Sequence, residues 1–228
     1  MVEQLPFKQL VASPILAGPT TMHLYGLVIG IAILIGINYF QKHNSIVPSR
    51  QVNIFIFGLL ISAIIGARAY HVIDQWSFYS QNLWLIPQTW LGGLGIFGAI
   101  LGALIFIFIF CFINKFKILK ILDLITPILP LCQAIGRLGN FVNRENPIWW
   151  LEAILDLFLF FIILKYPKNP TALYLIGYGL IRFVTEFFRT DTWIINNLKI
   201  GQLIGAVFII IGVSLIYRGR LKITQNHH

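Results

Sequence analysis

Seven apolar segments of about 16 to 23 residues constrain the fold of this chain more than any other feature. They cover residues 22–40, 52–73, 91–113, 121–139, 147–166, 173–188 and 200–217. A helix of roughly 20 apolar residues is long enough to cross the hydrocarbon core of a bilayer. Only 11% of the 228 residues are charged, whereas about a quarter are charged in soluble domains. We therefore predict an all-α polytopic membrane protein with seven transmembrane helices.

The length of the chain allows one polytopic membrane domain and little else, so we predict one integral membrane domain over residues 1–228. Within it we expect an interfacial segment at 1–22, a seven-helix bundle at 22–217 and a cytoplasmic tail at 218–228. The fourth apolar segment contains Pro127 and Pro130, which predict a kink or a broken helix. The two cysteines, Cys111 and Cys132, lie inside apolar segments and are expected to be reduced thiols.

The loops differ in their content of lysine and arginine. One side carries ten of these residues: Lys42, Arg50, Lys115, Lys117, Lys120, Lys165, Lys168, Arg218, Arg220 and Lys222. The other side carries four: Lys8, Arg144, Arg189 and Lys199. The positive-inside rule therefore predicts an N-terminus outside and a C-terminus in the cytoplasm. Orientation and attraction to anionic lipids account for the net charge of +9, so we expect membrane lipid and no nucleic acid as a partner.

Three further arginines, Arg68, Arg137 and Arg182, lie near the outer ends of the second, fourth and sixth segments. An unpaired charge at membrane depth costs several kcal/mol, so each arginine needs a partner. Other polar residues are expected at the same depth: His23, Tyr25, His71, Asn140, Asn143, Glu145, Glu152, Asp156, Glu186 and Arg189. We expect a net cationic pocket open to the outer leaflet, which suits the phosphate of a lipid head group.

Two of these arginines also have purely structural explanations. Arg182 and Glu186 stand four residues apart, the spacing of an ion pair within one helix. Arg68, near the end of a span, also fits a side chain that snorkels to the head groups. Arg137 lies between two glycines and precedes two asparagines, and we assign it a functional role. Gly139 permits close approach of another group to the backbone.

The ten residues from Gly136 to Glu145, with the sequence GRLGNFVNRE, resemble the signature G-R-x-G-N-F-x-N-x-E of the bacterial prolipoprotein diacylglyceryl transferases. Other stretches are similar to further motifs of that family, so that the resemblance covers nearly the whole chain. They are residues 18–27, 66–70, 90–94, 123–127, 177–189 and 201–202. The resemblance agrees with seven spans and an outside N-terminus.

The resemblance implies an enzyme of the bacterial cytoplasmic (inner) membrane. Its expected reaction transfers a diacylglyceryl group from phosphatidylglycerol to the lipobox cysteine thiol of a prolipoprotein signal peptide, releasing glycerol 1-phosphate. The leaving group is a phosphate anion, so positive charge beside it lowers the barrier. The reaction needs a general base for the thiol, but no metal and no cofactor.

The resemblance and the charge pattern together define the candidate site. The predicted catalytic residues are Arg137, Arg182, Glu145 and Tyr25. The predicted substrate-binding residues are Arg68, Asn140, Asn143, Gly139, Glu152, Glu186, Arg189 and His23. Arg137 and Arg182 are expected to hold the phosphate. The general base stays open among Glu145, Glu152, Tyr25 and His23.

Two departures from the family pattern suggest an alternative function. Phe97 occupies a position where the family usually has histidine or tyrosine, and the chain lacks an extracytoplasmic arm after Glu145. A non-catalytic lipid- or lipoprotein-binding membrane protein on the same scaffold is therefore the second hypothesis. A transporter of anionic solutes is a weaker third, because the intramembrane charges gather at the outer ends only.

Overall fold

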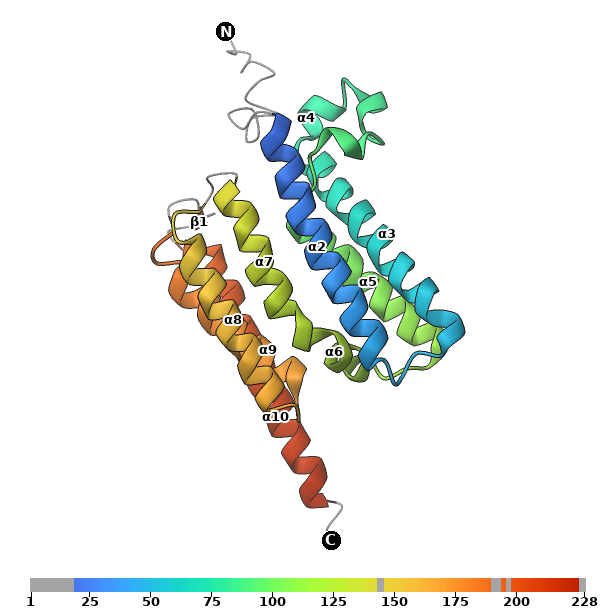
Figure 1. Cartoon of the computed structure of the whole chain (residues 1–228), viewed down its shortest axis with the longest axis vertical. Coiled ribbons are helices and arrows are strands. Elements are labelled where there is room, and N and C mark those ends of the chain that lie inside the picture. Colours follow the sequence, from blue (N-terminus) through green and yellow to red (C-terminus); the bar gives the residue numbers. More distant parts are fainter. Residues whose placement is uncertain (1–18, 143–145, 190–193, 196–197, 226–228) are drawn as a thin grey trace. The chain divides into compact units, whose positions relative to one another are not determined.

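A computed structural model describes residues 19–142, 146–189, 194–195 and 198–225, which are almost entirely helical (Figure 1). The long helices are α2 (Pro19–His43), α3 (Ser49–Asp74), α5 (Ile96–Asn114), α7 (Leu129–Val142), α8 (Trp149–Lys165), α9 (Pro170–Thr185) and α10 (Ile200–Gln225). Shorter elements are α4 (Trp76–Tyr79), η1 (Leu83–Leu85), η2 (Thr89–Leu91), α6 (Ile118–Ile125) and η3 (Thr126–Ile128). An antiparallel pair of two-residue strands, β1 (Ile194–Ile195) and β2 (Leu198–Lys199), is the one addition to the predicted all-α fold within the described residues.

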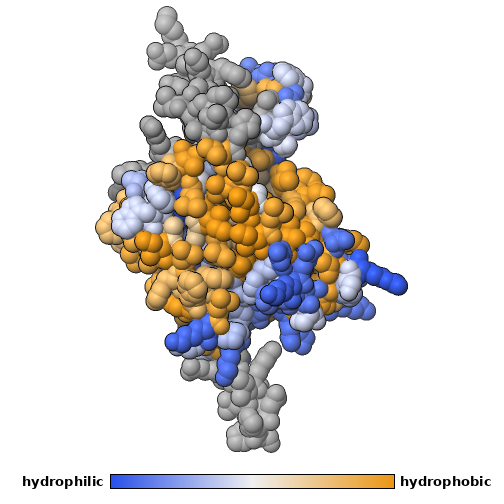
Figure 2. All heavy atoms as spheres, in the orientation of Figure 1, coloured by the Kyte–Doolittle hydropathy of each residue, from blue (hydrophilic) through white to orange (hydrophobic). Residues whose placement is uncertain are grey.

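Five stretches of the described chain are long and apolar enough to cross a membrane: Leu24–His43, Ser49–Asp74, Ile96–Asn114, Ile118–Val142 and Ile200–Arg218. Apolar side chains dominate the middle of the face shown in Figure 2, as expected of helices in contact with lipid. The chain is therefore a multi-pass membrane protein. The remaining two predicted segments form α8 and α9, of 17 and 16 residues. The count of seven spans and the orientation of the termini stay predictions.

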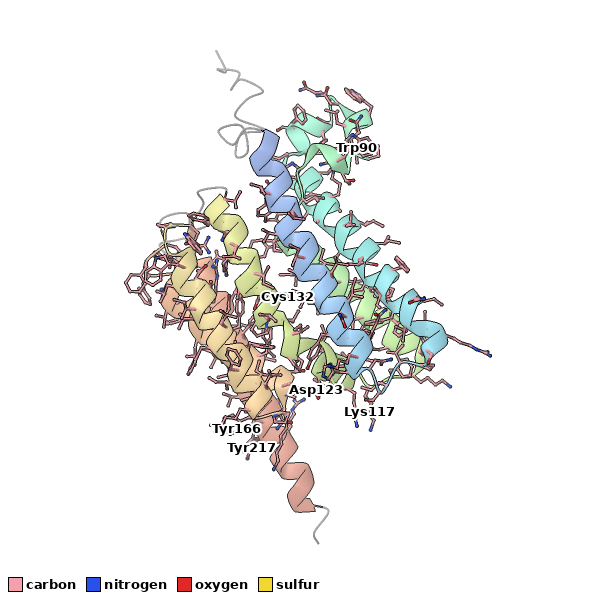
Figure 3. The ribbon with its side chains drawn as sticks, in the orientation of Figure 1. Trp90, Lys117, Asp123, Cys132, Tyr166 and Tyr217 are labelled. Carbon is pink, nitrogen blue, oxygen red and sulfur yellow. The ribbon has the colours of Figure 1, made fainter. Side chains whose placement is uncertain are left out.

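The fourth apolar segment is interrupted, as its prolines predicted. It begins as α6, passes through the 3-10 turn η3 at Thr126–Ile128 and continues as α7. Pro127 lies in that turn, where it lacks the amide hydrogen that a continuous helix would use. Asp123, labelled in Figure 3, accepts hydrogen bonds from the backbone nitrogen and the hydroxyl of Thr171, at 3.2 and 2.6 Å. The interrupted segment is thereby fixed to the first turn of α9.

The chain divides into two units, and the first comprises residues 1–43 and 122–228. In its described part, α2 packs on α7, α7 on α8, α8 on α9 and α9 on α10. The contact of α7 with α2 includes Cys132, whose thiol donates to the backbone oxygen of Ala32 at 3.3 Å (Figure 3). Both cysteines are free thiols, as predicted. The buried face of α8 is made by Glu152, Asp156, Leu159 and Ile163, so it is acidic at one end and apolar at the other.

The second unit comprises residues 44–121 and is a pair of long helices, α3 and α5, joined by an aromatic connection. That connection contains α4, η1 and η2 and carries three exposed tryptophans, Trp76, Trp84 and Trp90. Trp90 is labelled in Figure 3. Indole rings are typical of the boundary between lipid and water.

Candidate functional site

Helix α7 presents the central part of the signature. Arg137 and Asn140 stand three residues apart, so they share one face of this helix. Gly139 is buried, and a Cβ atom at this position would lie 2.6 Å from a ring carbon of Tyr25. The tyrosine of α2 can therefore lie against the backbone of α7 only because residue 139 has no side chain. The structure thus brings together the predicted residues Tyr25, Arg137, Gly139 and Asn140.

Helix α8 supplies two carboxylates to the same group of helices. Glu152 and Asp156 stand four residues apart on its buried face, and both are 0% exposed. The loop before α8 is shaped around the first of them. Asn146 adopts a positive φ of 54°, a backbone conformation that asparagine tolerates better than most residues. From there its side-chain amide donates to Glu152 Oε2 at 2.6 Å, while its side-chain oxygen accepts from the backbone nitrogen of Ile148.

Glu152 is the shared counter-ion of three arginines. Its Oε2 lies 3.1 Å from Nη1 of Arg137. Its Oε1 lies 3.9 Å from Nη1 of Arg182 and 3.6 Å from Nη1 of Arg189. Together with two further carboxylates, these residues form what we call the ionic cluster: Arg137, Arg182, Arg189, Glu152, Asp156 and Glu186. One buried carboxylate thus gathers three guanidinium groups, each of which can bind a phosphate in a bidentate way.

The third carboxylate, Glu186, is held between α9 and α10. Its Oε2 lies 3.2 Å from Nη2 of Arg182, so the predicted ion pair within one helix is confirmed. A Cβ atom at Gly201 would collide with the carboxyl group of Glu186, so the glycine allows the first turn of α10 to approach it. The N-terminus of a helix carries partial positive charge, which favours a buried carboxylate at this place. Lys199 donates to the backbone oxygens of Glu186 and Arg189, at 2.7 and 3.3 Å.

The ionic cluster contains equal numbers of arginines and carboxylates, and the ammonium group of Lys199 lies beside it. The expected net cationic pocket stays a prediction, because Arg144 and Glu145 lie outside the described residues. Three arginines meet three carboxylates among the described residues of the first unit. The arginines keep part of their surface accessible, between 13 and 20% of each side chain, whereas the carboxylates are at most 2% exposed. An anion that approaches the cluster therefore meets guanidinium groups first, with the carboxylates behind them.

Arg68 does not snorkel to the surface as one of our two explanations proposed. It is buried in the second unit, 7% exposed, and donates to four backbone oxygens. These belong to Leu85 (2.6 Å), Ile86 (2.8 Å), Gly92 (2.7 Å) and Gly93 (3.1 Å). Its guanidinium also lies 5.2 Å from the ring centre of Tyr79. Its hydrogen bonds organise the aromatic connection and give no support to a role as a phosphate ligand.

Other predicted residues have different outcomes. Asn143 and Glu145 lie outside the described residues, as does the side chain of His23, so their roles stay predictions. Phe97 is the second residue of α5 in the second unit, is exposed and lies beside Tyr70, with 6.2 Å between the ring centres. The ring at this position therefore packs on another aromatic side chain.

Sequence reasoning missed two parts of the polar interior. Asn146 was not singled out, although an asparagine just before a proline and a helix is a common turn signal. The pair of Gln133 and Tyr174 was also missed, because each residue alone reads as ordinary for a helix. In the structure the amide of Gln133 donates to the hydroxyl of Tyr174 at 2.9 Å, between α7 and α9. The polar interior of these helices therefore extends deeper than the charged residues alone indicated.

Comparison with known proteins agrees with this geometry. The sequence model of the family described as prolipoprotein diacylglyceryl transferase matches residues 12–149 and 146–218. A relative from Finegoldia magna is 33% identical and covers 89% of this chain and 93% of its own length. A relative from Streptococcus uberis is 33% identical, with coverages of 90% and 94%. One from Staphylococcus haemolyticus is 34% identical, with coverages of 90% and 86%. All three are named phosphatidylglycerol–prolipoprotein diacylglyceryl transferase.

The matches also indicate where this chain is shorter than its relatives. The alignment with the Finegoldia magna protein spans 231 positions but covers only 89% of these 228 residues, so that relative has internal residues without a counterpart here. The two parts of the family match meet at residues 146–149. This is the place after Glu145 where the sequence predicted that an arm is lacking.

Proposed function

This chain belongs to the prolipoprotein diacylglyceryl transferase family, and from this premise we propose that it transfers a diacylglyceryl group from phosphatidylglycerol to the lipobox cysteine thiol of a prolipoprotein. The names of its relatives support this reaction. The observation that carries the proposal for this chain is the convergence of three arginines on Glu152. Such a group is suited to a phosphate that becomes more negative as the reaction proceeds.

In the proposed reaction a sulfur–carbon bond forms at the glyceryl carbon and the bond from that carbon to a phosphate oxygen breaks. Glycerol 1-phosphate leaves with the bonding electron pair. Arg137, Arg182 and Arg189 stabilise this developing charge with their guanidinium groups. Because the arginines are already gathered by a buried carboxylate, little reorganisation is needed when the phosphate binds, and this preorganisation lowers the barrier.

The thiol proton goes to a general base, and the geometry narrows the candidates. Both carboxylate oxygens of Glu152 face guanidinium groups, and one of them also accepts a hydrogen bond from Asn146. We therefore assign Glu152 the role of counter-ion. Tyr25, which lies against Gly139, remains a candidate for the reacting end of the site. Glu145 and His23 stay predictions.

We also propose that the whole chain is one membrane domain with seven spans in the bacterial cytoplasmic membrane, its N-terminus outside. The loop charges support this orientation. It places the ionic cluster in the outer leaflet, on the side where an exported prolipoprotein presents its lipobox. Asn140 and the predicted Asn143 would then bind the glycerol or phosphate oxygens.

A turnover assay tests the proposal directly. The purified protein is placed in vesicles that contain phosphatidylglycerol, a lipobox peptide is added, and the diacylglyceryl thioether is measured by mass spectrometry. We expect product from the wild type and a loss of about 100-fold or more for Arg137→Ala, the range found when a group that stabilises developing charge is removed. Arg50→Ala, which alters an exposed arginine at the start of α3, is the matched control and keeps its activity.

The same assay decides the second hypothesis. Phe97 and the missing arm motivate a non-catalytic binding protein on this scaffold. Wild-type protein that is folded and binds phosphatidylglycerol, yet forms no thioether with any lipobox peptide, would reject the transferase and support the binding protein.

A further inference from the structure

Asp156 is a carboxylate of the ionic cluster to which the mechanism above gives no role. It lies one helical turn after Glu152 on the buried face of α8 and is 0% exposed. Within the described chain, neither of its two oxygens has a hydrogen-bond partner. A buried carboxylate without hydrogen bonds is costly and therefore needs an explanation.

Among the described residues, Asp156 forms an ion pair with Arg137. Oδ2 of Asp156 lies 3.8 Å from Nε of Arg137, which is too long for a hydrogen bond. This Nε is itself buried and has no hydrogen-bond partner in the described structure. A buried donor and a buried acceptor thus face one another across a gap that a small side-chain movement would close.

The opposite end of Arg137 is bound in a different way. Its Nη1 lies 3.1 Å from Oε2 of Glu152, an oxygen that also accepts the hydrogen bond from Asn146. Glu152 therefore has other partners that remain if Arg137 turns away, whereas within the described residues Asp156 forms an ion pair with Arg137 alone. The arginine lies between a carboxylate that can release it and a carboxylate that can receive it.

We infer that Asp156 is a positioning residue for Arg137, an inference that rests on the proposed function. When a phosphate takes the Nη nitrogens of Arg137, its Nε–H turns to Asp156 and forms a hydrogen bond. The carboxylate then fixes the plane of the guanidinium from behind while the phosphate binds it in front. An arginine held at both ends can present two parallel N–H groups to the leaving phosphate.

The variant Asp156→Asn is expected to change kcat and KM in a way that loss of a merely structural residue would not. It keeps the shape of the side chain but removes a negative charge next to Arg137. We expect kcat to fall by about 10- to 100-fold, because the guanidinium is no longer aligned. The KM for phosphatidylglycerol stays the same or falls, because an anion meets less negative charge. Asp156→Glu, whose longer side chain can close the 3.8 Å gap, recovers most of the activity.

Asp123→Asn is the matched control. This aspartate, in the same unit, binds the backbone nitrogen and hydroxyl of Thr171 and only joins two elements. Its replacement is expected to lower the melting temperature and to leave kcat and KM per folded molecule unchanged. A kcat of Asp156→Asn equal to that of the wild type would overturn the inference. The inference would also be overturned if Asp156→Asn lowered only the melting temperature and left kcat and KM unchanged, as expected for Asp123→Asn.

A binding measurement separates failure of this inference from failure of the proposed function. Titration of glycerol 1-phosphate into purified protein by calorimetry does not depend on turnover. We expect binding by the wild type, equal or tighter binding by Asp156→Asn, and loss of binding by Arg137→Ala. Binding without thioether formation by the wild type would reject the transferase alone. Weaker binding by Asp156→Asn would overturn the positioning role.

Discussion

Two regions of this molecule bury arginine side chains, and the two regions provide different partners for the guanidinium groups. In the first unit, Arg137, Arg182 and Arg189 share the carboxylate of Glu152 and keep part of each side chain accessible. In the second unit, Arg68 is buried and donates to four backbone oxygens. A carboxylate partner can be exchanged for a phosphate, since both are anions. Backbone oxygens that shape a connection cannot be exchanged without loss of that shape.

The partners of an arginine, more than its depth in the membrane, therefore separate a ligand-binding role from a structural one. Arg68 and Arg137 both lie toward the ends of long apolar segments, and the sequence alone gave them similar roles. Variants of the partners, as well as of the arginines, test this distinction.

The largest effect is expected from Glu152→Ala. Three guanidinium groups would lose their shared counter-ion, and removal of one partner from a buried ion pair destabilises a protein by about 3–5 kcal/mol. Equilibrium unfolding in mixed micelles measures this loss, with the isosteric Glu152→Gln as the milder companion. A loss of less than about 1 kcal/mol, the size found for exposed pairs, would show that Glu152 does not hold the cluster together.

Arg68→Ala is expected to have the next largest effect, about 2–3 kcal/mol, because four hydrogen bonds from a charged group disappear. The damage should be local. Hydrogen exchange of the backbone amides in residues 83–93 should speed up, whereas those of α8 keep their protection. Arg50→Ala again serves as the control. If Arg68→Ala abolished turnover while these amides stayed protected, the comparison between the two regions would fail.

Asn146→Ala is expected to cost about 1–2 kcal/mol, because Glu152 loses a hydrogen bond of 2.6 Å and the new side chain disfavours the positive φ. Asn146→Gly separates these causes, since glycine accepts the backbone conformation but cannot donate to the carboxylate. Thermal unfolding should place the glycine variant between the wild type and the alanine variant. Equal stability of all three proteins would argue against the support of Glu152 by this loop.

The smallest effect is expected from Phe97→His. This side chain is exposed at the start of α5, and surface substitutions of this kind usually change stability by less than about 0.5 kcal/mol. If the chemistry depends on the ionic cluster, turnover should not rise. A large gain in turnover would instead place part of the reacting machinery in the second unit.

The sequence allowed much of the fold to be predicted, because its signals are local. Runs of apolar residues gave the helices, and Pro127 marked the interruption that η3 provides. The pair of Arg182 and Glu186 followed from a spacing of four residues. These features depend on periodicity along one helix, which a sequence displays directly.

The rest depends on which groups meet across helices, and no spacing encodes that. The four backbone oxygens that bind Arg68 come together only through the path of the connection between α3 and α5. The convergence of three arginines on Glu152 needs the packing of α7, α8 and α9. The membership of the cluster could not be foreseen either, because Arg68 was counted with it and belongs to the other unit.

The short length of α8 has a consequence for the surrounding lipid. A helix of 17 residues is about 25 Å long, whereas the hydrocarbon core of a bilayer is about 30 Å thick. If α8 and α9 span the membrane, one way to match their length is a bilayer that is thinner beside them than elsewhere. Head groups around this part of the protein then lie deeper than in the bulk membrane. Local thinning would thus bring the phosphates of phospholipids toward the arginines and shorten the path of the lipid substrate into the site.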